Sequence, residues 1–473
     1  MNDVDVLVVG AGPAGMSAAT AARNGGLSVL VIDEQPGPGG QIWRSVETAA
    51  DRDAVLGSSF SEGRPVAESF RASGVHYENE AQLWLIERGF RAYVTKGGSA
   101  RVLTARTIVL ATGAQERPAP FPGWTLPGVL TVGAAQILLK SSGQIPSGPV
   151  WIAGNGPLPL LYATQLLNAG GELAGFLDTS PRGRWRFAAR HLPAALRAYG
   201  DLAKGLSWTV GLRRSAGRYV TGVDEIEAVG SGRLEQVRYR SGRKDWRSGD
   251  ASTLLVHEGV VPNIHVALSL GCEVRWNEAQ SCFAPVLDPD GETTVPGVFI
   301  AGDGMGIGGA KAALLRGEIT GHALVERLRG RSAGKIVSGL RKRLGAELAM
   351  RPLLDALYTP RAQVLEPADA TIVCRCEEVT AGDVRALGRV GQPGPNQLKA
   401  ASRAGMGPCQ GRQCGYTITR LLAETQGRSP ADVGFFNIRS PLKPVTLGEL
   451  ASLRGEERGS ETACAVGGDE RDG

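Results

Sequence analysis

A chain of 473 residues with 42% hydrophobic residues is long enough for two to four folded domains. Its formal net charge is only +5, with basic and acidic residues interspersed, which excludes any charge-based argument for a nucleic-acid partner. No apolar run reaches the ~18 residues of a membrane span and no signal-peptide pattern opens the chain, so we expect no transmembrane segment and a cytoplasmic location.

The first motif is VDVLVVGAGPAG, residues 4–15, which predicts a buried strand, a tight glycine turn and the start of a helix. The pattern is GxGxxG: the first glycine permits the turn, the second lets backbone approach a pyrophosphate, and the third lets helix and strand pack closely. Acids at the end of the next strand, 27–32, can bond ribose hydroxyls. The candidate nucleotide-binding residues are Gly10, Gly12, Pro13, Ala14, Gly15, Asp33 and Glu34.

Three further motifs follow in the order GGQ (39–41), ATGA (111–114) and AGDG (301–304). With GAGPAG they resemble the two-dinucleotide-binding flavoprotein family, which includes glutathione and thioredoxin reductases, over about residues 1–330. The resemblance implies FAD binding and places Asp303 on the ribityl chain. It adds the candidate residues Gly40, Gln41, Thr112, Gly113 and Gly302. Residues 1–271 contain no cysteine, which excludes the redox disulfide of many such reductases.

A second nucleotide-type fold is predicted between these motifs. A strand at 150–153 leads into GNGPLP, a helical run at 160–168, and a strand ending at Asp178. Gly154 and Gly156 are candidate binding residues, but Pro159 replaces the third glycine and cannot supply its close packing or its N–H. Three possibilities stay open for this fold: NAD, a second adenine nucleotide, or no cofactor.

Two later features can each be interpreted as structural or as functional. The arginine-rich segment 181–190, which contains Trp185 and Phe187, is either a patch for phosphate or an acidic partner, or a solvated helix face, which we favour. His257 is either an acid–base group or a structural hydrogen-bonding residue, and we favour the second. We read Cys272 and Cys282 as ordinary thiols.

Four cysteines form a CxC pair and, 32 residues later, a CxxxxC pair: Cys374, Cys376, Cys409 and Cys414. Four thiolates suit zinc or an iron–sulfur cluster, and a CxC pair ligates a larger cluster more comfortably than one small ion. Residues 373–415 resemble the small ferredoxin associated with bacterioferritin. This implies one [2Fe–2S] cluster on these four cysteines, with short helices at 381–387, 397–403 and 416–422. Zinc and the absence of a metal remain alternatives, and Cys464 lies in a tail that we expect to be disordered.

The predicted fold class is α/β: two Rossmann-like folds followed by a small, mainly helical [2Fe–2S] domain. We assign residues 1–117 and 255–330 to FAD binding and 118–254 to the second nucleotide fold. Residues 331–366 form a basic, partly helical connector, 367–430 the [2Fe–2S] domain, and 431–473 a C-terminal segment and tail.

A flavin and a [2Fe–2S] cluster on one chain argue for electron transfer between a two-electron substrate and a one-electron acceptor. The whole chain resembles the α subunit of hetero-oligomeric opine, proline or hydroxyproline dehydrogenases and the corresponding subunit of hydrogen cyanide synthase. The resemblance implies a FAD-containing β subunit that oxidises an amino acid, imino acid or opine at its C–N bond, and a small iron–sulfur subunit. The sequence indicates no catalytic residue in this chain. A self-contained NAD(P)H-dependent oxidoreductase is the first alternative, and a non-enzymatic docking or iron-handling protein is the second.

Overall fold

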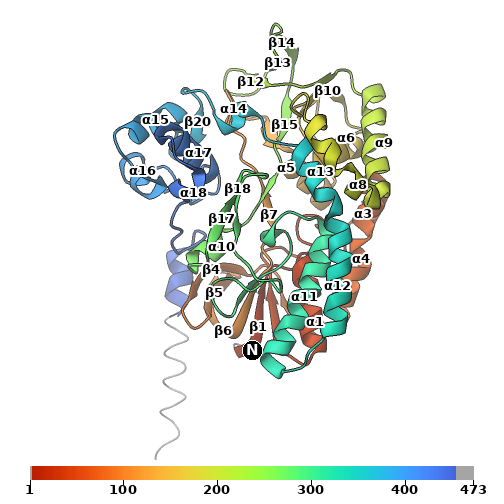
Figure 1. The fold of residues 1–473 in the computed structure, drawn as a ribbon, viewed down its shortest axis with the longest axis vertical. Helices are drawn as coiled ribbons and strands as arrows, with labels where there is room; N and C mark the ends of the chain where they lie inside the picture. The colour runs from red at the N-terminus through yellow and green to blue at the C-terminus, as the bar shows by residue number, and fades with distance from the viewer. Residues whose placement is uncertain (1–2, 454–473) are drawn as a thin grey trace, which may run out of the picture.

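The computed structural model describes residues 3–453, which form three packed units (Figure 1). The first unit contains a sheet of order β3-β2-β1-β6-β5-β4, with β19 beside the second half of β6. Its strands β1, β2, β3, β6 and β19 run parallel, whereas β4 and β5 form an antiparallel extension. The bounds are β1 (Asp3–Val9), β2 (Val29–Ile32), β3 (His76–Glu78), β4 (Gln82–Glu87), β5 (Arg91–Lys96), β6 (Ser99–Leu110) and β19 (Val298–Ile300).

Two long helices cover this sheet, α1 (Pro13–Asn24) and α11 (Ala310–Arg329), and they pack closely against each other. Glycines on α11 make this approach possible: a Cβ on Gly317 would lie 2.2 Å from the carbonyl oxygen of Ala14. Because helices cover the sheet, six consecutive residues of β1 are buried, as is typical of a central parallel strand. The glycine turn after β1 is therefore held between rigid elements.

The second unit is a five-stranded parallel sheet of order β11-β10-β9-β15-β8, with a three-stranded antiparallel sheet, β12-β13-β14, beside it. Helices α5, α6 and α9 belong to it. The boundary expected at residue 255 falls within β15, which pairs with β9, while β7 and β16 pair with each other between the two units. The bounds are β7 (Ala114–Glu116), β8 (Val129–Thr131), α5 (Val132–Ser142), β9 (Val150–Gly154), α6 (Pro157–Asn168), β10 (Leu173–Asp178), α9 (Tyr199–Ser215), β11 (Tyr219–Thr221), β12 (Glu225–Val229), β13 (Gln236–Arg240), β14 (Arg247–Asp250), β15 (Thr253–His257) and β16 (Val260–Pro262).

The connector expected at 331–366 consists of α12 (Gly334–Glu347), α13 (Arg351–Leu357) and α14 (Ala362–Leu365). It packs on both units. Leu340 of α12 contacts Leu315 and Ile319 of α11, and Leu353 of α13 joins a small apolar cluster with the second unit.

The third unit carries the four cysteines and follows the predicted helices closely. A short β20–β21 hairpin precedes three helices, and a capping box of Thr380 and Asp383 starts the first of them. Its core continues into the first unit, because Phe283 of β18 packs on Tyr416 and Phe435 with ring centroids 6.5 and 5.7 Å apart. On the side of the first unit the bounds are α10 (His265–Ser269), β17 (Val274–Asn277) and β18 (Cys282–Pro285). Those of the third unit are β20 (Ile372–Cys374), β21 (Val379–Thr380), α15 (Ala381–Arg389), α16 (Pro395–Ser402), α17 (Gly415–Gln426) and α18 (Pro430–Val433).

The C-terminal segment returns from the third unit to the first. The backbone N–H of Leu442 donates to the carbonyl of Trp84 at 2.7 Å, and the side chain of Gln82 donates to the carbonyl of Pro444. The segment thus pairs with the edge strand β4. Residues 454–473, including Cys464 and the tail, lie outside the described residues. None of the described helices has the length and hydrophobicity needed to cross a membrane.

Candidate functional site

The glycines of the first motif serve two different purposes. Gly10 has a φ of +105°, and an added Cβ would lie 2.5 Å from the carbonyl oxygen of Ala111. A Cβ on Gly15 would lie 1.8 Å from the carbonyl oxygen of Gly10. The fold therefore leaves no room for a side chain at either position. At Gly12, a Cβ would meet only the Cα of Gly40, at 3.7 Å. The open space in front of Gly12 fits a pyrophosphate held against backbone.

The two predicted ribose acids have different surroundings. Asp33 is buried, and its carboxylate accepts hydrogen bonds from the backbone N–H groups of Ala11 at 2.5 Å and Gln35 at 2.7 Å. Burial raises the pKa of Asp33, and these hydrogen bonds oppose that rise. Glu34 is half-exposed and forms an ion pair with Lys443 of the C-terminal segment. Asp33 therefore fixes the glycine turn, while Glu34 fixes the C-terminal segment beside it.

The remaining flavin motifs meet the glycine turn at the carboxyl ends of β6 and β19. Gly302 lies against Ala14, since a Cβ on Gly302 would be 2.6 Å from that methyl group. The Oδ1 atom of Asp303 accepts hydrogen bonds from the N–H groups of Gly308 and Gly309, just before α11. Thr112 and Gly113 follow β6 directly, and β6 lies between β1 and β19. The predicted residues are thus brought together at one edge of a parallel sheet, where such folds bind ligands.

A buried lysine that sequence reasoning missed lies beneath the GGQ turn. The Nζ of Lys140 donates to the carbonyl of Gln41 at 3.1 Å and to Gln136 Oε1 at 2.8 Å. Burial lowers the pKa of Lys140 from 10.5 to about 7, and the positive charge of Arg44 adds to this effect. Lysine near the end of a helix is ordinarily exposed, so no local pattern signals this contact.

The four predicted cluster ligands come together in two pairs. A hydrogen bond with Cys414 lowers the pKa of the Cys374 thiol to about 6. Cys376 interacts with Cys409, and its thiol pKa is raised, chiefly by burial. Across the described residues, no three His, Cys, Asp or Glu side chains are placed to hold one metal ion. A zinc ion needs three or four ligands around one point, whereas each iron of a [2Fe–2S] cluster takes two thiolates. All four thiols lie close enough to interact with one another, which fits a single [2Fe–2S] cluster held by four thiolates.

The basic residues of the cysteine unit have different surroundings. Arg412 lies beside Cys409, and burial lowers its pKa. Arg403 pairs with Glu377 at 2.9 Å, and the Nζ of Lys399 lies 5.7 Å from the centre of the Phe436 ring. Arg375 is exposed.

The ligand loop 409–414 contacts the first unit beside the predicted flavin turn. The side-chain amide of Gln115 donates to the carbonyl of Arg412 at 3.2 Å, and the N–H of Asn263 donates to the carbonyl of Gly113 at 3.0 Å. His265 is buried in the same region, and burial, with a smaller contribution from Arg412, lowers its pKa to about 3. The Gln115 bond thus joins the strand after the turn at 112–113 to the cysteine loop, and the neutral imidazole of His265 is buried near Arg412.

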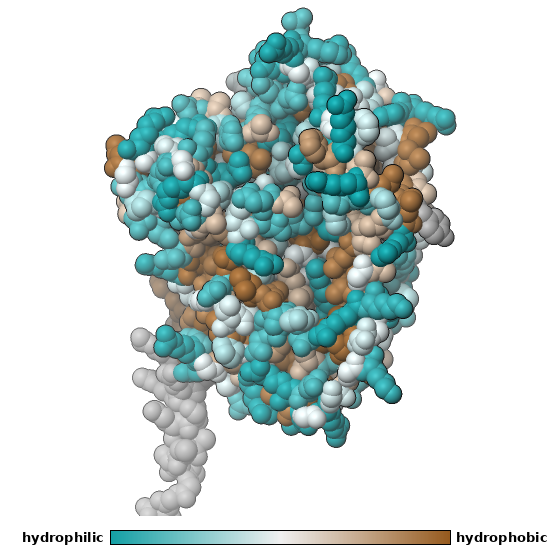
Figure 2. Space-filling view, viewed as in Figure 1, coloured by the Kyte–Doolittle hydropathy of each residue, from teal (hydrophilic) through white to brown (hydrophobic). Residues whose placement is uncertain are grey.

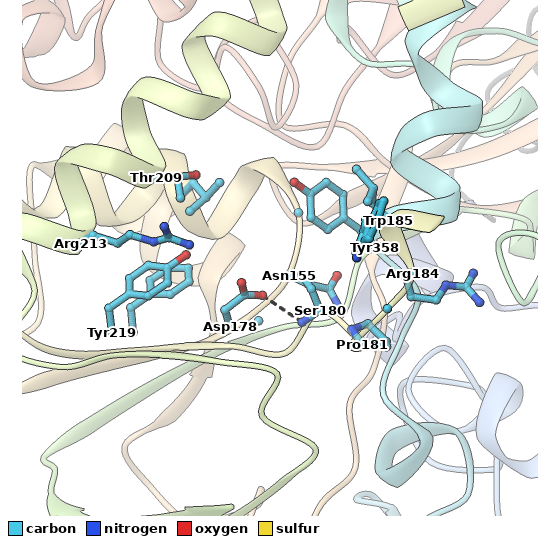
Figure 3. Close-up of a pocket in the computed structure, with 16 residues that line it drawn as sticks. Asn155, Asp178, Ser180, Pro181, Arg184, Trp185, Thr209, Arg213, Tyr219 and Tyr358 are labelled. Carbon is cyan, nitrogen blue, oxygen red and sulfur yellow. Dashed lines mark hydrogen bonds between the residues drawn. The ribbon is translucent and has the colours of Figure 1, made fainter. Parts of the chain in front are cut away.

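The second nucleotide fold has a pocket of about 270 Å³, which Figure 3 shows at the glycine turn after β9. Asp178, at the end of β10, accepts a hydrogen bond from the N–H of Ser180 at 2.9 Å. Arg213 of α9 lies over the ring of Tyr219, which stacks on Phe176. The other lining residues are Gly154, Asn155, Gly156, Leu160, Pro181, Gly183, Arg184, Trp185, Thr209, Leu357 and Tyr358.

The start of α6 does not fit a dinucleotide pyrophosphate. Pro157 corresponds to Pro13 of the first motif, but Pro159, in place of the third glycine, removes an N–H group at the helix start. The ring of Tyr358, from the connector, lies 3.9 Å from where a Cβ of Gly156 would be. Asn155 donates to the carbonyl of Thr359 at 3.0 Å, which holds the connector across the turn.

His257 is hydrogen-bonded to a carboxylate. Its Nδ1 lies 2.7 Å from Glu116 Oε1, and the other carboxylate oxygen of Glu116 accepts a hydrogen bond from the N–H of Gly133. Burial raises the thiol pKa of both Cys272 and Cys282, which keeps these cysteines in their neutral form. None of these groups forms part of the two predicted cofactor sites.

Comparison with known proteins matches two parts of the chain to two protein families. Residues 4–317 match the pyridine nucleotide-disulphide oxidoreductases, and residues 372–424 match the BFD-like [2Fe–2S] binding domain. The chain is 46% identical over 463 residues to one of the subunits of opine oxidase from Agrobacterium tumefaciens, covering 95% of this chain and 92% of that protein. It is 31% identical over 462 residues to the HcnB subunit of hydrogen cyanide synthase from Pseudomonas aeruginosa, covering 94% and 98%.

A solved structure has the same fold over nearly the whole chain. The L-proline dehydrogenase from P. horikoshii superposes with a TM-score of 0.70 at 20% identity, covering 95% of this chain and 79% of that one. The expected fold class, FAD and the [2Fe–2S] cluster are confirmed by these matches. The chain therefore belongs to the pyridine nucleotide-disulphide oxidoreductase family, as an oxidoreductase subunit related to those of opine oxidase and hydrogen cyanide synthase.

Proposed function

We propose that this chain is the electron-transferring subunit of a cytoplasmic hetero-oligomeric dehydrogenase or oxidase. A FAD-containing β subunit oxidises the C–N bond of an amino acid, imino acid or opine, and a small iron–sulfur subunit completes the assembly. This chain receives the electrons and passes them to an acceptor. The relatives support this proposal, since one is named as a subunit of opine oxidase and another as a subunit of hydrogen cyanide synthase.

The observation that carries the proposal is the contact between the two predicted cofactor sites. FAD exchanges two electrons with a donor and can release them singly, and a [2Fe–2S] cluster takes one at a time. In this chain, Gln115 bridges the flavin turn to the carbonyl of Arg412, between the cluster ligands Cys409 and Cys414. The buried rings of Phe283, Tyr416 and Phe435 also pack together where the first unit meets the cysteine unit.

We assign residues to each cofactor on this basis. FAD is held by the edge formed by Gly10, Gly12, Pro13, Ala14, Gly15, Asp33, Glu34, Gly40, Gln41, Thr112, Gly113, Gly302 and Asp303. The cluster is held by Cys374, Cys376, Cys409 and Cys414. The chain's own residues act by binding and orienting, and none is assigned an acid–base role.

A second candidate concerns the pocket at Gly154 and Gly156. Its glycine turn and the carboxylate of Asp178 favour an adenine nucleotide. Pro159 and Tyr358 oppose a bound NAD(P)H that reaches the flavin. We therefore assign this pocket to an adenine nucleotide that does not donate hydride, and rank the self-contained NAD(P)H oxidoreductase below the subunit function.

The test is to tag this chain, co-express it with the adjacent genes, and purify the assembly. We expect a second flavoprotein in fixed stoichiometry, and bleaching of flavin absorbance on addition of an opine, amino acid or imino acid. In Cys409→Ser, the visible absorbance of the cluster should disappear while the flavin spectrum remains. A chain that purifies alone and whose flavin is rapidly bleached by NADH in stopped-flow measurements would overturn the proposal.

A further inference from the structure

The segment between β10 and β11, residues 181–215, concentrates the positive charge of the chain. It contains eight arginines and lysines and a single acidic residue, so its net charge of +7 exceeds the +5 of the whole protein. Among the side chains that the structure describes, no carboxylate forms an ion pair with any of these eight cations. Arg184 donates instead to the carbonyl of Ala356, and the Nζ of Lys204 lies over the ring of Trp208. These charges are therefore left uncompensated within the described part of the chain.

The same segment exposes large apolar side chains. Trp185 is 64% exposed, Phe187 59%, and Leu206 66%. Leu206 and Val210 are four residues apart and thus lie on one face of α9. Figure 2 shows hydrophobic side chains gathered over α8 (Leu192–Ala195) and α9 at the right edge of the molecule. Residues 181–190 are mostly exposed, as the favoured interpretation of a solvated helix face expects, but the exposed rings of Trp185 and Phe187 favour a patch for an acidic partner.

We propose that this surface, the exposed side chains of residues 181–215, docks an acidic face of the substrate-oxidising β subunit. The inference rests on the proposed function, which supplies the partner. Arginine and aromatic residues are enriched in protein interfaces and dominate their binding energy. Uncompensated cations favour a partner that presents carboxylates around an apolar centre. We call this region the basic apolar surface.

A second copy of this chain fits the basic apolar surface poorly. In a two-fold symmetric dimer the same patch faces itself, so two surfaces of charge +7 would repel each other. The position of the surface also suits the proposed electron path. In Figure 1 the segment lies on the right of the molecule, and the [2Fe–2S] unit, α15–α18, lies on the left. A β subunit docked on the right leaves the cluster unit accessible to an acceptor.

The test measures the affinity between this chain and the purified FAD-containing β subunit encoded beside it. Arg184, Trp185 and Arg213 also line the nucleotide pocket, so the variants avoid them. We choose Arg190→Glu with Arg197→Glu for the charge, and Leu206→Ser with Val210→Ser for the apolar part. Each pair should weaken binding at least ~10-fold, and the wild-type affinity should fall as salt is raised.

Matched controls are Arg88→Glu with Arg331→Glu, which reverse two exposed arginines elsewhere, and Val390→Ser, at a residue 74% exposed on the cysteine unit. Both should bind the β subunit with wild-type affinity. All variants should retain the flavin and cluster spectra, which shows that they fold.

The outcomes separate this inference from the proposed function. If the β subunit binds wild type and both surface variants equally, the docking surface is wrong while the subunit function stands. If wild type binds no second flavoprotein, both fail. Binding to phosphatidylserine vesicles that is lost in the arginine variant, with unchanged β-subunit affinity, would reassign the surface to a membrane. Self-association that is lost in the Leu206 and Val210 variant would reassign it to a second copy.

Discussion

At the scale of residues, the glycines of the first motif show how one pattern serves folding and binding separately. Gly10 and Gly15 are required by the fold, because an added methyl group at either would overlap backbone. Gly12 has ordinary extended backbone, with a φ of −73°, and space in front of it. We therefore propose that the ligand, and not the fold, requires glycine at position 12.

This difference predicts opposite results for two substitutions. Gly15→Ala should lower the free energy of unfolding of the apoprotein by at least ~1–3 kcal/mol, because its methyl group overlaps the Gly10 carbonyl. Gly12→Ala should leave that stability within ~0.5 kcal/mol and lower the FAD content of the purified protein. Chemical denaturation of apoprotein and the flavin-to-protein absorbance ratio measure the two effects. Full FAD retention by Gly12→Ala would contradict our placement of the pyrophosphate.

At the scale of elements, α5 supports the flavin-binding edge through the buried Lys140. Its ammonium group connects α5 to the GGQ turn through the carbonyl of Gln41, and to Gln136, which in turn donates to Gln165 of α6. Two helices of the second unit are thereby tied to a turn of the first. Burying the charged ammonium group of Lys140 costs free energy. Burial therefore favours the neutral amine and lowers the pKa of Lys140 to about 7.

The Lys140 site predicts a pH dependence of stability. Its folded-state pKa of about 7 lies below the unfolded value of 10.5, so between these pH values the unfolded chain binds more protons. The stability of wild type relative to Lys140→Met should therefore rise as pH increases from 7 toward 10. Unfolding midpoints of both proteins across this range provide the measurement, and the variant cancels contributions from other groups. Parallel profiles would show that Lys140 is not desolvated in solution.

At the scale of the whole molecule, the connector joins the units through a buried ion pair. The Nε of Arg361 donates to Glu258 Oε1 at 2.6 Å, and the backbone N–H of Arg361 donates to the other carboxylate oxygen at 3.1 Å. Both side chains are almost fully buried. Glu258 follows β15 of the second unit, and Arg361 leads toward the cysteine domain, so this pair sets how the third unit is attached.

Replacing one residue of the Arg361–Glu258 pair should lower the free energy of unfolding far more than replacing both. Arg361→Met leaves the Glu258 charge buried and should lower the free energy of unfolding by ~3–5 kcal/mol. Arg361→Met combined with Glu258→Gln should recover much of that loss. As a control, Arg341→Met removes the exposed pair with Asp290 and should cost less than ~1 kcal/mol. Urea unfolding of the four proteins tests this, and equal losses for the buried and exposed pairs would refute the role of Arg361.

Several parts of this protein follow from local sequence because their causes are local. The glycine turn at 10–15, the three helices of the cysteine unit and the CxC and CxxxxC pairs were all predictable, since backbone sterics and ligand chemistry act over a few residues.

The sequence by itself determined the family of folds, the two cofactors and the four cysteines that we assign to the cluster. The tertiary structure alone decided that Asp33 is buried under the glycine turn while Glu34 meets Lys443, and that Tyr358 covers Gly156. It also decided that Gln115 reaches the cysteine loop and that Trp185 and Phe187 face outward. The physical reason is that burial, exposure and pairing depend on residues hundreds of positions apart, which no local pattern records.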